Sequence, residues 1–105
     1  DKNNSNLNSA YTDGKFSPID VSNSMVRNAD ASGLETDQKH SPITVNSTTV
    51  KNSGSVGLRT SADSCEIHVF DSKIINNGSK GIYSTGNYSS INVEQSFINN
   101  NSIQL

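Results

Sequence analysis

The chain has 105 residues with 8 basic and 10 acidic side chains, a net charge of −2. Its length allows one domain. The charge balance provides no basic field for nucleic acid and no polybasic stretch for an anionic membrane. No apolar run approaches the ~18 residues that a membrane span needs. We therefore expect no nucleic-acid partner and no membrane insertion.

Composition alone favours disorder, because the chain holds fifteen asparagines and nineteen serines and only 30% hydrophobic residues. Globular domains usually contain ~45–50% apolar residues. The few apolar residues nevertheless recur at fixed intervals, which a disordered segment has no reason to show. The lone cysteine, Cys65, excludes an internal disulfide and argues against a thiolate metal site.

One pattern repeats at an interval of 24 residues with no insertion. Its first copy is Ile19-x-Val21-x-x-Ser24-x-Val26-x-Asn28, and three further copies begin at Ile43, Ile67 and Ile91. A glycine followed by an aliphatic residue closes three of the units, at Gly33-Leu34, Gly57-Leu58 and Gly81-Ile82. Constant spacing with constant chemistry indicates a repeat protein whose units stack to bury a shared core.

Each unit predicts three short strands and no helix. In the second unit the alternation at Ile43-Thr44-Val45 marks the first strand, Val50 and its neighbours the second, and Leu58-Arg59-Thr60 the third. Units of constant size can coil, so that each turn pairs in parallel with the next at ~4.8 Å. We predict an all-β, single-domain β-solenoid of about four turns. In chain order these are a partial turn at 1–16, full turns at 17–40, 41–64 and 65–88, and an incomplete turn at 89–105.

Three further sets of repeated residues fit turn chemistry. An asparagine at the second bend tolerates a left-handed backbone, and its amide can bond the asparagines above and below in a ladder. Small hydroxyls at the first bend can bond local backbone, and the glycines supply positive φ or room. The ladder comprises Asn28, Asn52, Asn76 and Asn100, and the hydroxyls are Ser24, Thr48, Ser72 and Ser96.

The unit Ile67-x-Val69-x-x-Ser72-x-Ile74-x-Asn76-Asn77-x-x-x-Gly81-Ile82 resembles the right-handed parallel β-helix repeat of pectate-lyase-like proteins and phage tailspikes. The resemblance covers residues 17–105 and implies a right-handed coil with three sheets. It further implies a polysaccharide or surface glycan as ligand and an extracellular, cell-surface or virion location. Calcium is implied only as a cofactor that lyases of this fold use. The family includes lyases, hydrolases, epimerases, adhesins and inert stalks, so it does not fix an activity.

Outward positions of the predicted strands are the candidate binding residues. The outward position of the third strand reads Tyr11, Glu35, Arg59 and Tyr83 in successive turns. We call such a column of aligned residues from successive turns a file. This file either forms a surface on which a sugar ring stacks or holds an exposed Glu35–Arg59 ion pair with the guanidinium on a tyrosine ring. On the first strand, His68 is either a sugar contact or general base, or simply a surface histidine, since adjacent turns carry no carboxylate at its phase. The loops 37–42, 61–66 and 85–90 should lie together along one edge.

No catalytic residue follows from the pattern. Glycoside hydrolysis needs two carboxyl groups ~5–9.5 Å apart, whereas Asp20 and Glu94 lie three turns, ~14 Å, apart on the first-strand face. His40 has no second ligand at metal spacing, and we assign no metal and no cofactor. The chain alone is therefore expected not to be an enzyme. If it is part of one, a polysaccharide lyase or glycoside hydrolase is the class to test.

The two ends of such a coil expose apolar stacks and unpaired strand edges, which require caps. We expect further turns in a longer chain or association into a homo-oligomer, a trimer included. Two functional hypotheses stay open: a structural, glycan-binding module of an extracellular or phage surface protein, and a segment of a polysaccharide lyase, hydrolase or epimerase. A self-templating solenoid with asparagine ladders is a third.

Overall fold

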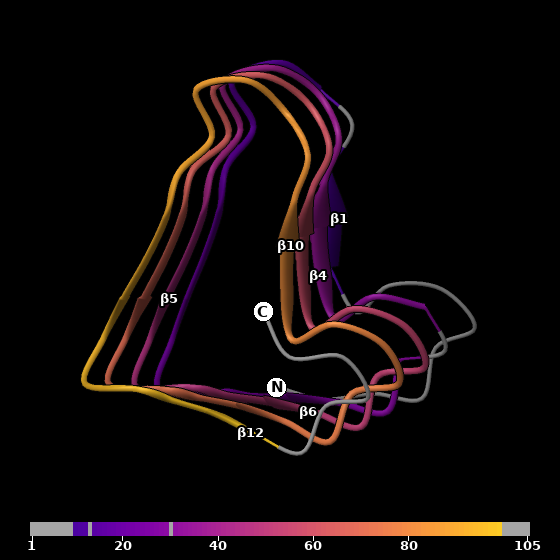
Figure 1. Cartoon of the computed structure of the whole chain (residues 1–105), viewed down its shortest axis with the longest axis vertical. Helices are drawn as coiled ribbons and strands as arrows, with labels where there is room; N and C mark the ends of the chain where they lie inside the picture. Colours follow the sequence, from indigo (N-terminus) through magenta and orange to yellow (C-terminus); the bar gives the residue numbers. More distant parts are fainter. Residues whose placement is uncertain (1–9, 13, 30, 100–105) are drawn as a thin grey trace.

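The computed structural model describes residues 10–12, 14–29 and 31–99, and the chain coils around a three-sided core (Figure 1). Three full turns each contain three short strands, and further strands precede and follow them. The strands are β1 (Ala10–Thr12); β2 (Ile19–Ser22), β3 (Met25–Arg27) and β4 (Leu34–Thr36); β5 (Ile43–Asn46), β6 (Thr49–Lys51) and β7 (Leu58–Thr60); β8 (Ile67–Phe70), β9 (Lys73–Ile75) and β10 (Ile82–Ser84); β11 (Ile91–Glu94) and β12 (Phe97–Asn99).

Corresponding strands of successive turns form three parallel sheets. The first sheet has the order β11-β8-β5-β2, the second β12-β9-β6-β3, and the third β1-β4-β7-β10. Every pairing joins residues 24 positions apart, as in Ile19 with Ile43 and Leu34 with Leu58. The predicted all-β solenoid with three strands per turn is confirmed, and the right hand of the coil stays a prediction. The described residues form no helix, hence none that could cross a membrane.

The core consists of aliphatic side chains stacked on their counterparts in neighbouring turns. Ile43, Ile67, Leu58 and Ile82 have no exposed surface, and their inward direction follows from the strand period of two. Burying one such side chain fully stabilises a fold by about 1.5–3 kcal/mol. Because aliphatic neighbours in adjacent turns cover these side chains, as Ile43 and Ile91 cover Ile67, few apolar residues suffice. This explains how a chain with 30% hydrophobic residues folds.

Burial declines at the last turn. Val69 in β8 is buried, whereas Val93 at the same phase in β11 is 40% exposed. Ile91 is likewise only partly buried, although Ile67 beside it has no exposed surface. The apolar stack is thus more accessible at β11 than at β8.

At three corners of each turn, a residue other than glycine adopts the left-handed backbone conformation with positive φ. The residues with positive φ form three files at intervals of 24: Asn23, Ser47, Asp71 and Gln95; Asn28, Asn52 and Asn76; Phe16, His40, Ser64 and Tyr88. The glycine file does not have positive φ. A Cβ on Gly33 would lie 2.7 Å from the carbonyl oxygen of Gly57. Of the two reasons predicted for these glycines, close approach between turns is therefore the correct one.

The asparagine file has the predicted left-handed backbone at Asn28, Asn52 and Asn76, with φ of 63°, 59° and 58°. The N–H of Asn28 donates to the carbonyl of Lys51 in the next turn at 3.2 Å. The amide-to-amide ladder stays a prediction, and Asn100 lies outside the described residues. A buried amide occurs one position later, where Asn77 Oδ1 accepts the N–H of Ser53 at 3.0 Å.

The hydroxyls of the first bend connect successive turns. Each bonds local backbone as predicted; Thr48 Oγ1, for example, donates to the carbonyl of Asn46 at 2.9 Å. Thr48, Ser72 and Ser96 also accept the N–H of the counterpart in the preceding turn, as Ser72 Oγ does from Thr48 at 3.0 Å. These bonds satisfy buried backbone groups at a corner where no strand pairing is available. The file comprises Ser24, Thr48, Ser72 and Ser96.

Cys65 occupies a second such file, otherwise made of serines. The N–H of Ser41 donates to Cys65 Sγ at 3.4 Å, and the N–H of Cys65 donates to Ser89 Oγ at 3.0 Å. The thiol itself donates to the carbonyl of Gln38 at 3.0 Å. Cys65 is fully buried and therefore takes the place of a serine hydroxyl in a structural hydrogen-bond file.

Replacing the same residue type at two depths tests the burial gradient. We expect Ile67→Ala to lower the free energy of unfolding by about 2–5 kcal/mol, because it opens a cavity between two covering turns. Ile91→Ala, at the same phase in β11, should cost clearly less, since that side chain is only partly buried. Urea denaturation followed by circular dichroism measures both. Equal losses would contradict the lower burial of Ile91.

The Cys65 file predicts opposite effects for two small substitutions. Cys65→Ser should keep or raise the free energy of unfolding, by up to about 1 kcal/mol, because a hydroxyl makes stronger bonds than a thiol. Cys65→Ala should lower it by about 1–3 kcal/mol, since the buried N–H of Ser41 loses its acceptor. The same denaturation experiment compares them. Equal destabilisation by serine and alanine would show that the thiol acts only through packing.

Candidate functional site

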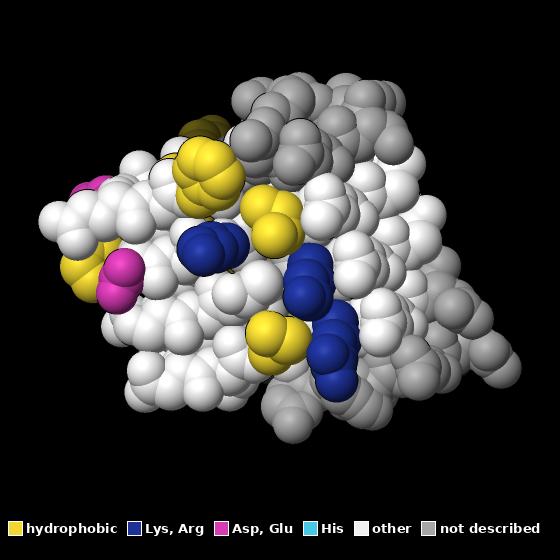
Figure 2. Space-filling view, turned by 90° about the horizontal axis from the view of Figure 1, so that it is seen from below, with side chains coloured by type: hydrophobic (Ala, Val, Ile, Leu, Met, Phe, Trp, Pro, Cys, Tyr) yellow, Lys and Arg dark blue, Asp and Glu magenta, His cyan; other side chains and the backbone are white. Residues whose placement is uncertain are grey.

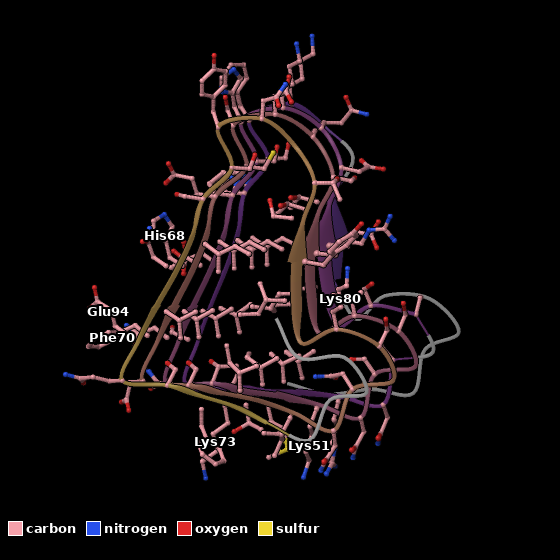
Figure 3. All side chains as sticks on the ribbon, in the orientation of Figure 1. Lys51, His68, Phe70, Lys73, Lys80 and Glu94 are labelled. Atoms are coloured by element: carbon pink, nitrogen blue, oxygen red, sulfur yellow. The ribbon has the colours of Figure 1, made fainter. Side chains whose placement is uncertain are left out.

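A pocket of about 160 Å³ lies on the outer face of the first sheet, between β8 and β11. It is lined by His68, Val69 and Phe70 of β8 and by Asn92 and Glu94 of β11. Figure 3 shows His68, Phe70 and Glu94 projecting outward from the same side of the coil. The strand period places these side chains outside, while Val69 between His68 and Phe70 points into the core.

The pocket combines an apolar ring with polar groups of several kinds. Register places Asn92 beside His68 and Glu94 beside Phe70 on adjacent strands. The phenylalanine is 42% exposed, so part of its ring faces solvent. An aromatic face, an amide, an imidazole and a carboxylate therefore face solvent within one pocket.

His68 has a partner at each ring nitrogen. Nε2 lies 2.9 Å from Glu66 Oε1, and Nδ1 lies 3.5 Å from the amide nitrogen of Asn92. These contacts fit the tautomer in which Nε2 carries the proton and donates to the carboxylate while Nδ1 accepts from the amide. Both members of the Glu66–His68 pair are about half exposed, so the pair itself contributes at most about 1 kcal/mol. The Glu66–His68 contact orients the imidazole ring of His68 at the pocket.

Sequence reasoning missed Glu66. The prediction compared His68 only with residues at its phase on adjacent turns, which are Thr44 and Asn92 and carry no carboxylate. The carboxylate instead comes from the same chain segment, two residues earlier, where the strand alternation places it on the same outward side. That spacing was the signal that would have identified the pair.

The candidate residues divide between two sheets. Tyr11, Glu35, Arg59 and Tyr83 are in register on β1, β4, β7 and β10 of the third sheet, as predicted. His68 belongs to the first sheet and is not part of this file. The predicted Glu35–Arg59 ion pair is not found, because Glu66–His68 is the one pair within 4.0 Å among the described residues.

Cations lie against the aromatic ring of the third-sheet file. The guanidinium carbon of Arg59 is 6.0 Å from the ring centroid of Tyr83, in agreement with the predicted contact. The ammonium of Lys80 is closer, at 3.9 Å. Because this cation occupies a face of the ring, less of Tyr83 is free to stack on a ligand.

The loops after the third strands carry a file of aromatic side chains. Phe16 and His40 stack with centroids 4.8 Å apart and planes 4° from parallel. Tyr88 occupies the same file two turns beyond His40 and is 87% exposed, and Ser64 stands between them. The prediction treated His40 as an isolated loop residue and missed this stack, which the phase shared by Phe16 and His40 would have indicated.

Carboxylates are dispersed on these faces. Asp20 and Glu94 lie on β2 and β11, the two outermost strands of the first sheet, as the repeat predicts. Among residues 10–12, 14–29 and 31–99, no three histidine, cysteine or acidic side chains are grouped to hold a metal ion.

Completing the aromatic file should stabilise the coil. Ser64 has the same φ, 60°, as His40, and aromatic residues already occupy this conformation at Phe16 and Tyr88. We expect Ser64→Phe to raise the free energy of unfolding by about 0.5–1.5 kcal/mol through stacking on His40 and Tyr88. Urea denaturation measures the change against Ser64→Ala. If both variants are equally stable, the file does not stack through this position.

No protein-family model, no curated protein and no solved structure matches the chain.

Proposed function

We propose that the chain is a structural, glycan-binding β-solenoid module of an extracellular or phage surface protein, of the tailspike or appendage type. The observation that supports this most directly is the pocket formed by His68, Phe70, Asn92 and Glu94. A sugar ring presents an apolar C–H face to an aromatic ring and hydroxyls to hydrogen-bonding groups. The pocket supplies both kinds of partner on adjacent strands.

The size of the pocket favours one saccharide unit of a longer polymer. Pockets for whole small ligands usually measure ~300–1,000 Å³, and this one measures about 160 Å³. The same face continues over β5 with Thr44 and Asn46, which are adjacent to His68 and Phe70. A polymer that crosses the strands along the axis of the coil would meet a hydrogen-bonding side chain on each turn.

Each saccharide unit is expected to bind weakly. A hydrogen bond contributes about 0.5–1.5 kcal/mol net, so a few such bonds and one ring contact give a dissociation constant near 1 mM, for which about 4 kcal/mol suffices. Contacts on further turns or in further copies would raise the avidity without new chemistry. The apolar stack accessible at Val93 supports such an arrangement, with packing against further turns or a second copy, a trimer included.

The third-sheet file is the weaker candidate for the glycan. Its Tyr83 ring already carries the Lys80 ammonium at 3.9 Å. Phe70, in contrast, has no such cover and lies within a pocket. The proposal therefore transfers the main sugar contact from the third-sheet residues to the first sheet, and of the predicted residues it keeps His68.

One observation favours the alternative that the chain is a segment of a polysaccharide lyase, hydrolase or epimerase. His68 is held by Glu66 at 2.9 Å, and an imidazole oriented by a carboxylate is a common arrangement for a general base. Glu94 borders the same pocket. Such an enzyme would act on a sugar bound against Phe70.

A glycan array followed by calorimetric titration of the bound polymers tests the proposal. We expect Phe70→Ala and Asn92→Ala each to weaken binding about tenfold, which corresponds to the loss of about 1.4 kcal/mol. Phe97→Ala is the matched control, since it removes an exposed phenylalanine from the second sheet.

Assay of the bound polymers for new reducing or unsaturated ends separates the two candidates. Binding without cleavage supports the module, and cleavage that His68→Ala abolishes supports the enzyme. The absence of any bound glycan, or unchanged binding by Phe70→Ala, would refute the assignment of the pocket.

A further inference from the structure

The outer face of the second sheet carries cations and apolar side chains side by side. Figure 2 shows this face, with dark blue and yellow side chains alternating over the sheet. We call it the basic-apolar face, and it consists of Met25 and Arg27 on β3, Lys51 on β6, Lys73 and Ile75 on β9, and Phe97 on β12.

The sheet register brings the three cations together. Arg27 and Lys51 are paired on adjacent strands, ~4.8 Å apart. Lys73 lies on the next strand beside Thr49, two residues along the strand from the level of Lys51, which adds ~6.6 Å. The backbone positions of the three cations therefore fall within about 12 Å of one another, although roughly one turn of sequence separates each from the next. This explains why no polybasic stretch is visible in the sequence.

These cations have no carboxylate partner within the described part of the chain. Its one ion pair is Glu66–His68, on the first sheet. Arg27 and Lys73 are exposed, and Lys51 is half-buried. Three unneutralised positive charges on one face of a chain with net charge −2 form a local field that opposes the charge of the whole.

The described side chains of this face offer few uncharged groups that would recognise a sugar. Among them, Thr49 is the one uncharged polar side chain that points outward, whereas the first sheet presents Thr44, Asn46 and Asn92. The apolar side chains between the cations include Phe97, which is 55% exposed. Cations interleaved with exposed apolar groups on a flat surface are suited to a layer of anionic headgroups above acyl chains.

We propose that the basic-apolar face docks on the surface of a bilayer that contains anionic lipids. Arg27, Lys51 and Lys73 contact the headgroup phosphates and carboxylates, and Phe97 and Met25 reach between the headgroups. The chain lies on the membrane in this arrangement and does not cross it. The assignment is independent of the glycan pocket, which is on a different sheet.

Sedimentation with vesicles tests the proposal on the full chain. The chain should bind vesicles of mixed phosphatidylcholine and phosphatidylserine, not vesicles of phosphatidylcholine alone, and high salt should release it. The combined variant Arg27→Gln, Lys51→Gln, Lys73→Gln should lower the partition coefficient about 100-fold, from roughly a factor of five per cation. The matched control Lys15→Gln, Lys39→Gln, Lys80→Gln changes the net charge equally but at other positions, and it should bind as the unmodified chain does.

A second variant distinguishes a bilayer from a soluble polyanion. Phe97→Ser should weaken binding to the mixed vesicles and leave binding to dextran sulfate unchanged, because only the bilayer offers an apolar layer. Circular dichroism verifies that each variant is folded. Phe70→Ala should bind vesicles normally, so that failure of the glycan proposal would be seen separately.

Three outcomes would overturn the inference: equal binding to neutral and mixed vesicles, an equal loss in the control triple variant, or binding to dextran sulfate without binding to vesicles.

Discussion

Parallel pairing of residues 24 positions apart, with backbone hydrogen bonds between successive turns, is the interaction on which the rest of this structure depends. It extends beyond the strands into the corners, where the N–H of Phe16 donates to Lys39 and that of Asn28 to Lys51. Because corners and strands keep the same register, each side chain lies over its counterpart in the next turn. A shift of one residue in the register of a strand would move all of its inward side chains to the opposite face.

The stacking of similar residues in successive turns explains the amino-acid composition of the chain. Aliphatic residues are buried in files at the first, second and third strands, and hydroxyls or a thiol form files at two corners. The hydroxyls in these files can be buried because most of them accept an N–H from the adjacent turn and donate to a nearby carbonyl, as Ser72 and Thr48 do. Abundant serine is therefore part of the packing here, and composition-based expectations of disorder fail for that reason.

The sequence was sufficient to predict the strands, the register and the outward positions of the first and third strands, because all three follow from one period. The sequence predicted the backbone conformation at the corners less well. Positive φ was expected at glycine or asparagine, yet Phe16 and His40 adopt it. Hydrogen bonds between turns fix the backbone there and outweigh residue preference. Contacts along one chain segment, such as Glu66 with His68, also depend on side-chain geometry that a comparison of turns does not reveal.

The same register explains why the outer faces of different sheets can carry different side chains. Inward positions determine the fold, so outward positions of each sheet can change without disturbing the others. The pocket residue Phe70 and the cation Lys73 are separated along the chain only by Asp71 and Ser72, which turn the chain at a corner. With the second sheet on a bilayer, the first sheet would rise away from the surface beyond that corner (Figure 1). The glycan pocket would then face solvent, and both proposed ligands could be bound at once.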